Sequence, residues 1–253
     1  MKKKLKFLLL ALGGFIVLMV LGLAITGWVM NKPLPEGKSG PEAEALADEM
    51  LAAINIEAWD DLALLQWEFP GGYRYFWSKK ENFVEVKWEN MRVLLNPETR
   101  SGKVYADGKI MENGEKKEEM LQHAFHRFAN DSFWLVAFTK VRDPGTERKL
   151  VELEDGNRGL MITYSSGGVT PGDSYLWILD ENGRPLAWQM WVEIIPVGGL
   201  RLGWSPWEKL YNGAMVAPVH LGSVFDLVLT DVKAGTNIAE FGYDVDPFLA
   251  LED

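Results

Sequence analysis

The sequence predicts an α+β fold: a strongly curved antiparallel β-sheet, or half-barrel, capped by helices and preceded by one N-terminal transmembrane helix. Three observations lead to this prediction. Apolar and polar residues alternate through much of residues 60–111 and 149–232, which is the period of half-buried strands. Apolar residues at helical spacing come before and between these regions. An uncharged run of 24 residues near the N-terminus exceeds the roughly 20 that cross a bilayer.

The N-terminal part predicts a retained membrane anchor. Residues 1–6 form a basic flank, residues 7–30 the uncharged span with Trp28 at its interfacial end, and residues 31–41 a linker rich in Pro and Gly. The basic flank places the remainder, residues 42–253, on the far side of the membrane. We therefore expect a single-pass protein of the plasma (inner) membrane with a periplasmic domain. The alternative is a long cleavable signal ending near Ala24, although the apolar run continues past that site.

The exported domain begins with an amphipathic helix over residues 41–59, in which Leu46, Met50 and Ile54 recur at helical spacing. Consecutive antiparallel strands follow to residue 111, each with one apolar and one polar face, and a hairpin turn at Asp107-Gly108. On a single sheet these strands create an aromatic surface larger than one helix can cover.

A second helix is expected over residues 116–130, with Leu121, Phe125 and Phe128 on one side. Residues 132–141 are apolar all round, which is typical of a short buried helix or of a loop that plugs the sheet. We call residues 133–138 the lid segment.

Strands resume after the lid segment and lead to a hairpin over residues 174–193. Its turn is Asp180-Glu181-Asn182-Gly183, and residues 175–179 are apolar on both faces, so each face of that strand must be covered. Further strands are expected at residues 200–204, 207–211 and 215–220. A last strand covers residues 224–232, and the tail beyond it is irregular.

Composition favours a binding surface over catalysis. The chain has 11 Trp, 12 Phe and 7 Tyr but only 3 His and no Cys, so thiolate chemistry and disulfides are excluded and transition-metal ligands are few. Residues 33–253 retain 21 of the 26 basic side chains against all 36 acidic ones, a net charge of −15. Such an acidic domain is repelled by phosphate backbones, so we expect no nucleic-acid partner.

The alternating aromatic residues predict a cavity for a lipid, an acyl chain or another apolar ligand on the concave face of the sheet. A well-packed aromatic core is the alternative explanation of the same pattern. Two arguments favour the cavity: the helices are too few to cover the sheet, and an exported domain is placed where apolar molecules must be carried through water. The residues expected to line the cavity are Trp67, Tyr75, Trp77, Trp88, Phe133, Trp134, Trp188, Met190 and Trp204.

Other candidate groups are explained more simply by structure. Glu119, His123 and His126 share one helical face, but a lone helix offers too few ligands for zinc, and we expect no metal and no cofactor. Ser165 and Ser166 lie in a Gly-rich connection without a phosphate-binding or nucleophile motif. Asp173 is expected to cap its turn; as a catalytic base it has no partner visible in the sequence, so no catalytic residue is predicted.

The order of elements resembles the LolA/LolB-like lipoprotein carriers. The similarity lies in the first helix, the Asp107-Gly108 hairpin, the apolar lid segment, the Asp180–Gly183 hairpin and a late strand with Phe225, Leu227 and Leu229. It covers residues 41–232 as topology and contains no diagnostic motif. The resemblance implies a half-barrel closed by helices over a hydrophobic cavity that accepts acyl chains. This chain departs from the family because it lacks a lipid-acceptor cysteine and has an apolar N-terminal run.

The sequence thus predicts a membrane-anchored, non-catalytic envelope protein that binds a lipid or another apolar ligand. Two alternatives remain: a solid-core scaffold that contacts another envelope protein through outward aromatics such as Trp191 or Trp207, and a hydrolase of glycans or lipids that uses Asp173.

Overall fold

The computed structural model describes Gly27 and residues 31–154, 156–166 and 170–251. The predicted membrane span, residues 7–30, lies outside the described residues apart from Gly27. None of the helices within the described ranges combines the length and the apolar composition that a bilayer span needs.

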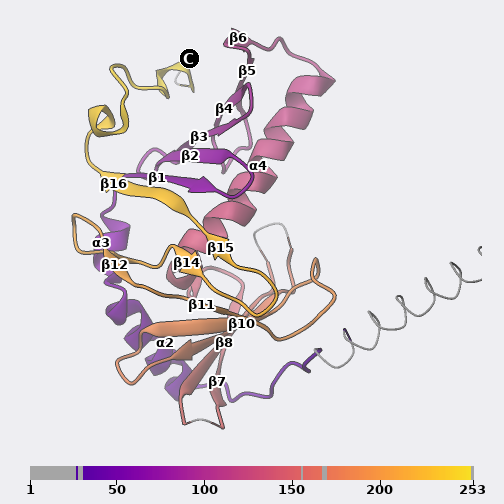
Figure 1. Ribbon diagram of the computed structural model, residues 1–253, viewed down its shortest axis with the longest axis vertical. Coiled ribbons are helices and arrows are strands. Elements are labelled where there is room, and N and C mark those ends of the chain that lie inside the picture. Colours follow the sequence, from indigo (N-terminus) through magenta and orange to yellow (C-terminus); the bar gives the residue numbers. More distant parts are fainter. Residues whose placement is uncertain (1–26, 28–30, 155, 167–169, 252–253) are drawn as a thin grey trace, which may run out of the picture.

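Two antiparallel sheets form the domain, the larger in the upper half of Figure 1 and the smaller in the lower half. The large sheet has the order β16-β1-β2-β3-β4-β5-β6 and the small sheet β11-β10-β9-β8-β7. The strands of the large sheet are β1 (Leu64–Phe69), β2 (Tyr73–Ser78), β3 (Phe83–Trp88), β4 (Met91–Leu95), β5 (Gly102–Ala106), β6 (Lys109–Ile110) and β16 (Thr230–Gly235). Those of the small sheet are β7 (Thr146–Glu152), β8 (Arg158–Tyr164), β9 (Ser174–Leu179), β10 (Pro185–Trp191) and β11 (Leu200–Gly203).

A short hairpin joins the two sheets edge to edge. It consists of β14 (Val219–His220) and β15 (Leu227–Val228), and β15 leads almost directly into β16 of the large sheet. On the other side, β11 meets this hairpin through a bridge between Leu202 and Gly222 and a hydrogen bond from the Gly203 amide to the Leu221 carbonyl, 2.8 Å long. The result is one curved antiparallel surface that stays open between β6 and β7. The predicted α+β curved sheet is confirmed, and no closed barrel forms.

Alternation along the strands places one row of apolar side chains on the inner face of each sheet, because side chains two residues apart point the same way. Each row is set by direct cross-strand pairing. In the large sheet the row is Trp67, Tyr75, Val86, Val93 and Val104. In the small sheet it is Leu150, Leu160, Trp177, Trp188 and Leu202. Both rows contribute to a single hydrophobic core.

The first helical region is broken in two, so the prediction of one helix over residues 41–59 is wrong. α2 (Pro41–Ala53) ends before Ile54, and α3 (Ile56–Asp60) begins after Asn55, whose φ of 57° is left-handed. Asn tolerates this conformation better than most residues, and its side-chain amide donates to the Gly213 carbonyl at 3.1 Å. The break lets Trp59 reach the core, where its indole N–H donates to the Met215 carbonyl.

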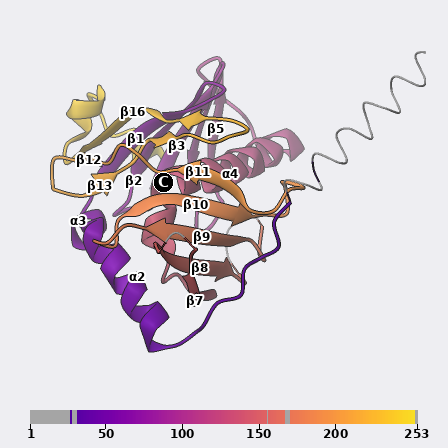
Figure 2. The same ribbon diagram turned by 60° about the horizontal axis from the view of Figure 1, so that its bottom comes forward.

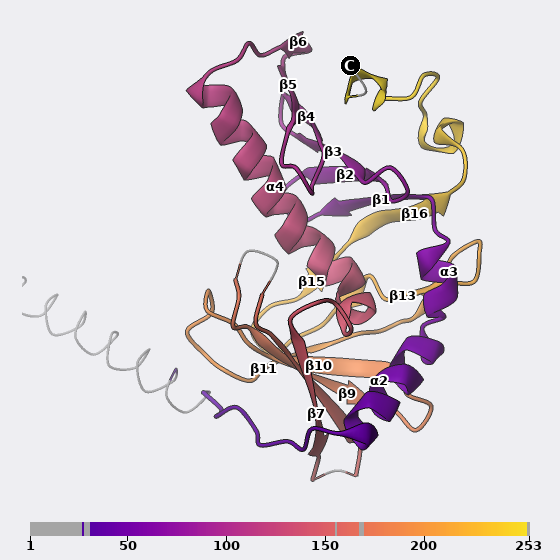
Figure 3. The same ribbon diagram turned by 180° about the vertical axis from the view of Figure 1, so that it is seen from behind.

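The second helix is longer than predicted. α4 (Glu115–Val136) continues past Asn130 and passes directly into the 3-10 helix η1 (Ala137–Lys140). Residues 132–141 were expected to be a short buried helix or a loop, and their first part, up to Val136, is instead the end of α4. Figure 3 shows α4 crossing from the tip of the large sheet to the small sheet.

The later strands are shorter than predicted. β12 (Glu208–Lys209) and β13 (Met215–Val216) form a two-residue pairing, and Pro218 separates β13 from β14 because proline lacks the N–H that a ladder needs. The expected strand over residues 224–232 is divided at Leu229 into β15 (Leu227–Val228), which pairs with β14, and β16 (Thr230–Gly235), which pairs with β1. Phe225 therefore lies in the hairpin turn and is 38% exposed.

The outer face of the large sheet is partly covered, although the sequence predicted it to be polar and wet. The C-terminal tail, with the 3-10 helices η2 (Ile238–Phe241) and η3 (Leu249–Leu251), folds back over β2 and β4. Phe248 of the tail stacks on Phe76 of β2 with ring centroids 5.7 Å apart, and Leu94 is buried beside them. An irregular tail can provide this cover because a few aromatic side chains bury much area.

We predict that Phe138→Ala lowers the free energy of unfolding by about 3–5 kcal/mol, because the ring is fully buried between Trp59, Trp204 and Trp207 and its removal leaves a cavity. Chemical denaturation of the two proteins measures the difference. Ile110→Ala, at a half-exposed position on β6, should change stability by less than about 0.5 kcal/mol. Equal effects of the two substitutions would contradict the packing described here.

Candidate functional site

The inner face of the small sheet carries a cluster of three tryptophans. Trp177 of β9, Trp188 of β10 and Trp204, which follows β11, touch one another with ring centroids 4.9 to 5.1 Å apart. All three are fully buried. His220 of β14 packs edge-on against Trp204 at 4.2 Å. This Trp cluster, with Tyr175 beside it, forms the floor of the concave face.

The lid segment, residues 133–138, covers this floor. Phe133 packs against Tyr175 at 5.0 Å and Tyr164 at 5.5 Å, and Trp134 packs edge-on against Trp188 at 5.1 Å. At its far end Phe138 contacts Trp204 at 5.5 Å. Phe133 and Trp134 are only half-buried, so the near end of the lid segment reaches solvent. The lid segment therefore fills the concave face above the Trp cluster with the protein's own side chains.

A second aromatic group lies on the inner face of the large sheet, around Phe128 of α4. Trp67, Tyr75 and Trp77 surround this ring with centroid distances of 6.2, 6.3 and 5.3 Å. Trp67 also stacks on Tyr75 at 4.7 Å. Helix α4 thus separates the aromatic group of the large sheet from the Trp cluster of the small sheet.

All nine residues predicted to line a cavity lie in or against the single core. Trp67, Tyr75, Trp188, Met190 and Trp204 are buried in it, and Trp77, Trp88, Phe133 and Trp134 are partly buried against it. Trp67, Tyr75 and Trp77 belong to the aromatic group around Phe128, and Trp188 and Trp204 belong to the Trp cluster, whereas Phe133 and Trp134 lie on α4 itself. The protein's own side chains fill the space between the two sheets. Alternation assigned the seven residues outside the lid segment to the inner face, but it did not select Trp177, which has the same environment.

Many polar atoms of this interior have no hydrogen-bond partner in the described part of the chain. Each is a buried group that normally finds one. They are the indole nitrogens of Trp67, Trp77, Trp177, Trp188 and Trp204, both ring nitrogens of His220, the Tyr164 hydroxyl and the Arg127 Nε. Trp59, Trp191 and Trp207 differ, because each donates to a backbone carbonyl at 2.8 Å. The unpartnered indoles therefore all belong to the inner faces of the two sheets.

His220 is the most completely enclosed titratable group of the Trp cluster. Burial lowers its pKa to about 4, although backbone groups of Trp134 and Gly203 act in the opposite direction. The ring is consequently neutral at pH 7 and presents one N–H donor and one free acceptor nitrogen to the aromatic interior.

Asp131 forms a buried polar centre that sequence reasoning missed. Its carboxylate accepts hydrogen bonds from the Tyr75 hydroxyl at 2.5 Å, from Arg127 Nη2 at 2.6 Å and from the Asn130 side chain at 2.9 Å. Burial raises the pKa of Asp131 against the opposing effect of these donors, and burial also raises the pKa of Tyr75. Only the spacing of Arg127 and Asp131, one helical turn apart, was visible as a signal in the sequence.

A small group of ion pairs fastens the C-terminal end of the lid segment to α2. Arg142, two residues after η1, binds Glu44 at 2.7 Å and Asp48 at 2.6 Å, and Arg148 of β7 also binds Glu44, at 2.9 Å. The hydrogen bond from Arg148 is the main cause of a lowered pKa at Glu44. We call this group the Arg142 clasp. Because the charges are partly exposed, each pair contributes little on its own, and salt weakens it.

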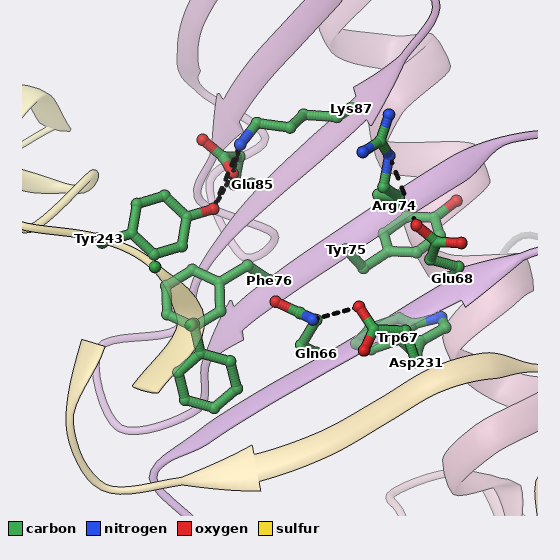
Figure 4. Close-up of a pocket in the computed structure, with 12 residues that line it drawn as sticks. Gln66, Trp67, Glu68, Arg74, Tyr75, Phe76, Glu85, Lys87, Asp231 and Tyr243 are labelled. Atoms are coloured by element: carbon green, nitrogen blue, oxygen red, sulfur yellow. Dashed lines mark hydrogen bonds and ion pairs between the residues drawn. The ribbon is translucent and has the colours of Figure 1, made fainter. Parts of the chain in front are cut away.

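A polar hollow of about 260 Å³ lies on the outer face of the large sheet (Figure 4). Its charged groups are paired with one another: Gln66 donates to Asp231 at 2.5 Å, and Arg74 faces Glu68 at 3.6 Å. Buried Glu85 binds Lys87 at 2.6 Å and accepts from the Tyr243 hydroxyl of the tail. These interactions hold the tail on the sheet, and the hollow offers a ligand few free polar groups.

The other groups considered from the sequence have structural environments. Asp173 accepts from the Glu193 amide at 3.0 Å and from the Thr170 hydroxyl at 2.6 Å, so both its oxygens are engaged in capping a loop. Ser165 bonds the Gly145 carbonyl through its amide and its hydroxyl. His123 lies 3.0 Å from the Tyr73 hydroxyl, and among the described residues no cluster of three or more His, Cys, Asp or Glu could hold a metal.

Comparison with known proteins yields similarity at the level of structure. No protein-family model and no curated protein matches the chain. A DUF1329 family protein from Desulfovibrio piger covers 79% of this chain and 96% of its own, with a TM-score of 0.40 and 10% identity. An outer membrane lipoprotein-sorting protein domain from Vibrio parahaemolyticus covers 77% of this chain and 97% of its own, with a TM-score of 0.33 and 11% identity.

A lipoprotein-sorting domain is thus among the solved structures to which the chain is similar. At TM-scores of this size the likeness extends no further than the general course of the chain. What the concave face binds has to be inferred from its own side chains.

We predict that His220→Leu flattens the pH dependence of stability between pH 7 and pH 4. The unfolded chain takes up a proton near pH 6.5 that folded His220 accepts only near pH 4, so the native protein loses stability as pH falls through this window. The loss attributable to His220 is roughly 2–3 kcal/mol. Denaturation of both proteins at several pH values measures it, with the difference at pH 8 giving the effect of packing alone. Parallel profiles would exclude this role of His220.

Proposed function

We propose that this protein is a membrane-anchored envelope protein that binds a lipid or another apolar ligand on the concave face of its curved sheet, without catalysis. In this proposal residues 7–30 hold the protein in the plasma (inner) membrane and the described domain lies in the periplasm. The observation that carries the proposal is the lid segment, an aromatic stretch of the chain packed into the concave face above the Trp cluster.

The ligand would bind by exchange with the lid segment. Phe133 and Trp134 cover Tyr175 and Trp188 with the kind of apolar surface that an acyl chain also offers. With the lid segment packed on these residues the concave face is closed, and the apparent affinity is reduced by the fraction of molecules that are closed. Phe133 and Trp134 are half-exposed but lie within α4, so exchange requires their side chains to turn away from Tyr175 and Trp188 while the helix stays in place.

The unpartnered polar atoms favour a ligand that carries acceptor oxygens. A pure hydrocarbon would leave the indole N–H groups of Trp177, Trp188 and Trp204 unpaired, whereas the ester or carboxyl oxygens of a lipid could accept from them. Buried donors of this kind cost about 1–3 kcal/mol each when unpaired, which a ligand can recover. An amphiphilic lipid therefore suits the interior better than an alkane.

A second candidate function is a tethered interaction protein with a solid core. Trp191 and Trp207, the aromatics expected to form its patch, are only partly exposed, and their indoles are bonded to the protein's own backbone. A different apolar patch favours this candidate: the β14–β15 hairpin and its neighbour Leu186. Its most exposed members are Leu221 and Val224, each 58% exposed.

If this patch binds a partner, Leu221→Lys should reduce the size of the complex solubilised from native membranes.

We predict that Phe133→Ala strengthens binding of a phospholipid with a fluorescent acyl chain by about 5–30-fold, because it weakens the closed state by about 1–2 kcal/mol. The full chain in detergent micelles is titrated with the lipid, and native mass spectrometry of the same samples counts the lipids retained.

Phe125→Ala provides the matched control. It removes the same half-buried side chain from the same helix, but on the turn that contacts Arg100 and not the lid segment. This variant should bind lipid like the unchanged protein. Equal affinity of Phe133→Ala and Phe125→Ala, or no lipid retained by any of the three proteins, would exclude exchange at the lid segment and leave the solid-core candidate.

A further inference from the structure

The loop between β10 and β11, residues 192–199, is unusually apolar for an exposed connection. Its sequence is Val-Glu-Ile-Ile-Pro-Val-Gly-Gly. Val192 and Ile195 pack against the core, whereas Ile194 points away from it and is 69% exposed, the highest value among the large apolar side chains that the structure describes. A single exposed apolar residue is ordinary on a protein surface, so a role for Ile194 has to be argued from the place of this loop in the fold.

The loop is bonded to the start of the described domain. The Lys32 amide donates to the Gly198 carbonyl at 2.9 Å, and the Gly198 amide donates to Asn31 Oδ1 at 2.7 Å. The Trp191 indole adds a third bond, to the Lys32 carbonyl at 2.8 Å. Figure 2 shows this junction, where the chain following residue 31 meets the loop beyond β10. The loop and the residues 31–32 therefore keep a fixed relation to each other.

Asn31 directly follows the uncharged run of residues 7–30, whose length suits a bilayer span. Once this run crosses the membrane, the surface of the bilayer passes within a few residues of Asn31. The loop, held to Asn31 and Lys32, must then lie at that surface as well. We propose that residues 192–199 form a membrane contact in which Ile194 enters the interfacial layer of the bilayer.

The negative net charge of the domain is consistent with an apolar membrane contact. Residues 33–253 carry a net charge of −15, so headgroup attraction cannot hold the domain against an anionic membrane, and the contact has to be apolar. Lys32 lies at the junction, where a basic side chain can reach the headgroups. A second copy of the chain or a protein partner would not account for the bonds between the loop and the end of the apolar run.

The contact also orients the concave face. The Glu193 amide bonds Asp173, and Trp191 pairs with Ser174, so the loop lies at the strand ends that carry Tyr164 and Tyr175. Phe133 packs on both these tyrosines. The half-exposed end of the lid segment is thus on the membrane side of the domain. The membrane contact rests on the anchoring by residues 7–30 that belongs to the proposed function, but not on the proposed lipid binding.

The test uses the absence of cysteine from the chain. The full-length Ile194→Cys protein is labelled with an environment-sensitive fluorophore and reconstituted into phosphatidylcholine nanodiscs, with and without lipids that carry a nitroxide near the top of the acyl chain. Val245→Cys, at a 67% exposed position in the C-terminal tail, serves as the control of matched exposure. Lipid-borne nitroxide should quench the label at position 194 about threefold more than that at position 245, since interfacial residues sit within several ångströms of this depth.

Equal quenching at the two positions would overturn the proposal. So would a label at position 194 that is shielded from a water-soluble quencher but untouched by the lipid-borne nitroxide, because that result indicates a protein partner or a second copy on the loop. Circular dichroism of both variants before labelling verifies that each is folded.

Discussion

The packing of the lid segment and α4 into the concave face is the interaction on which the rest of the structure depends. Phe128 fills the centre of the large sheet, and Phe133, Trp134 and Phe138 fill the small sheet, so one helix with its 3-10 extension joins both halves into a single core. A curved sheet open between β6 and β7 would otherwise leave its inner aromatic rows in water, at a cost of about 25 cal/mol for each Å² exposed.

Local chemistry made much of the fold predictable from the sequence. Period-two alternation identified the strands of both sheets, and the turns at Asp107-Gly108 and Asp180–Gly183 lie where expected because positive φ angles there require such residues. The features that were missed depend on distant parts of the chain. α4 continues through Asp131, whose carboxylate binds Tyr75 of β2, and the outer face of β2 is buried because Phe248 of the C-terminal tail covers it.

The candidate site was predictable to the same extent. Alternation shows which side chains of the strands point inward, and the seven predicted residues outside the lid segment pack in or against the core, but it cannot show what fills the space between them. Filling depends on how far α4 extends and where it crosses the sheets, which is a tertiary property. The unpartnered indoles of Trp188 and Trp204 were equally hidden, since whether a donor finds an acceptor depends on all its neighbours. The interior is therefore lined mainly by apolar side chains, but it also contains buried polar atoms that have no hydrogen-bond partner among the described residues.

The opening between β6 and β7 has a consequence for how the domain behaves in a crowded compartment. Any sheet that does not close on itself leaves two strands able to recruit a neighbouring molecule and polymerise. Here one such border, β6, is only two residues long and carries Lys109. The other, β7, is rich in charged residues and is capped by the bridge between Lys38 and Leu150. The fold can thus stay unclosed without offering a template for fibre growth.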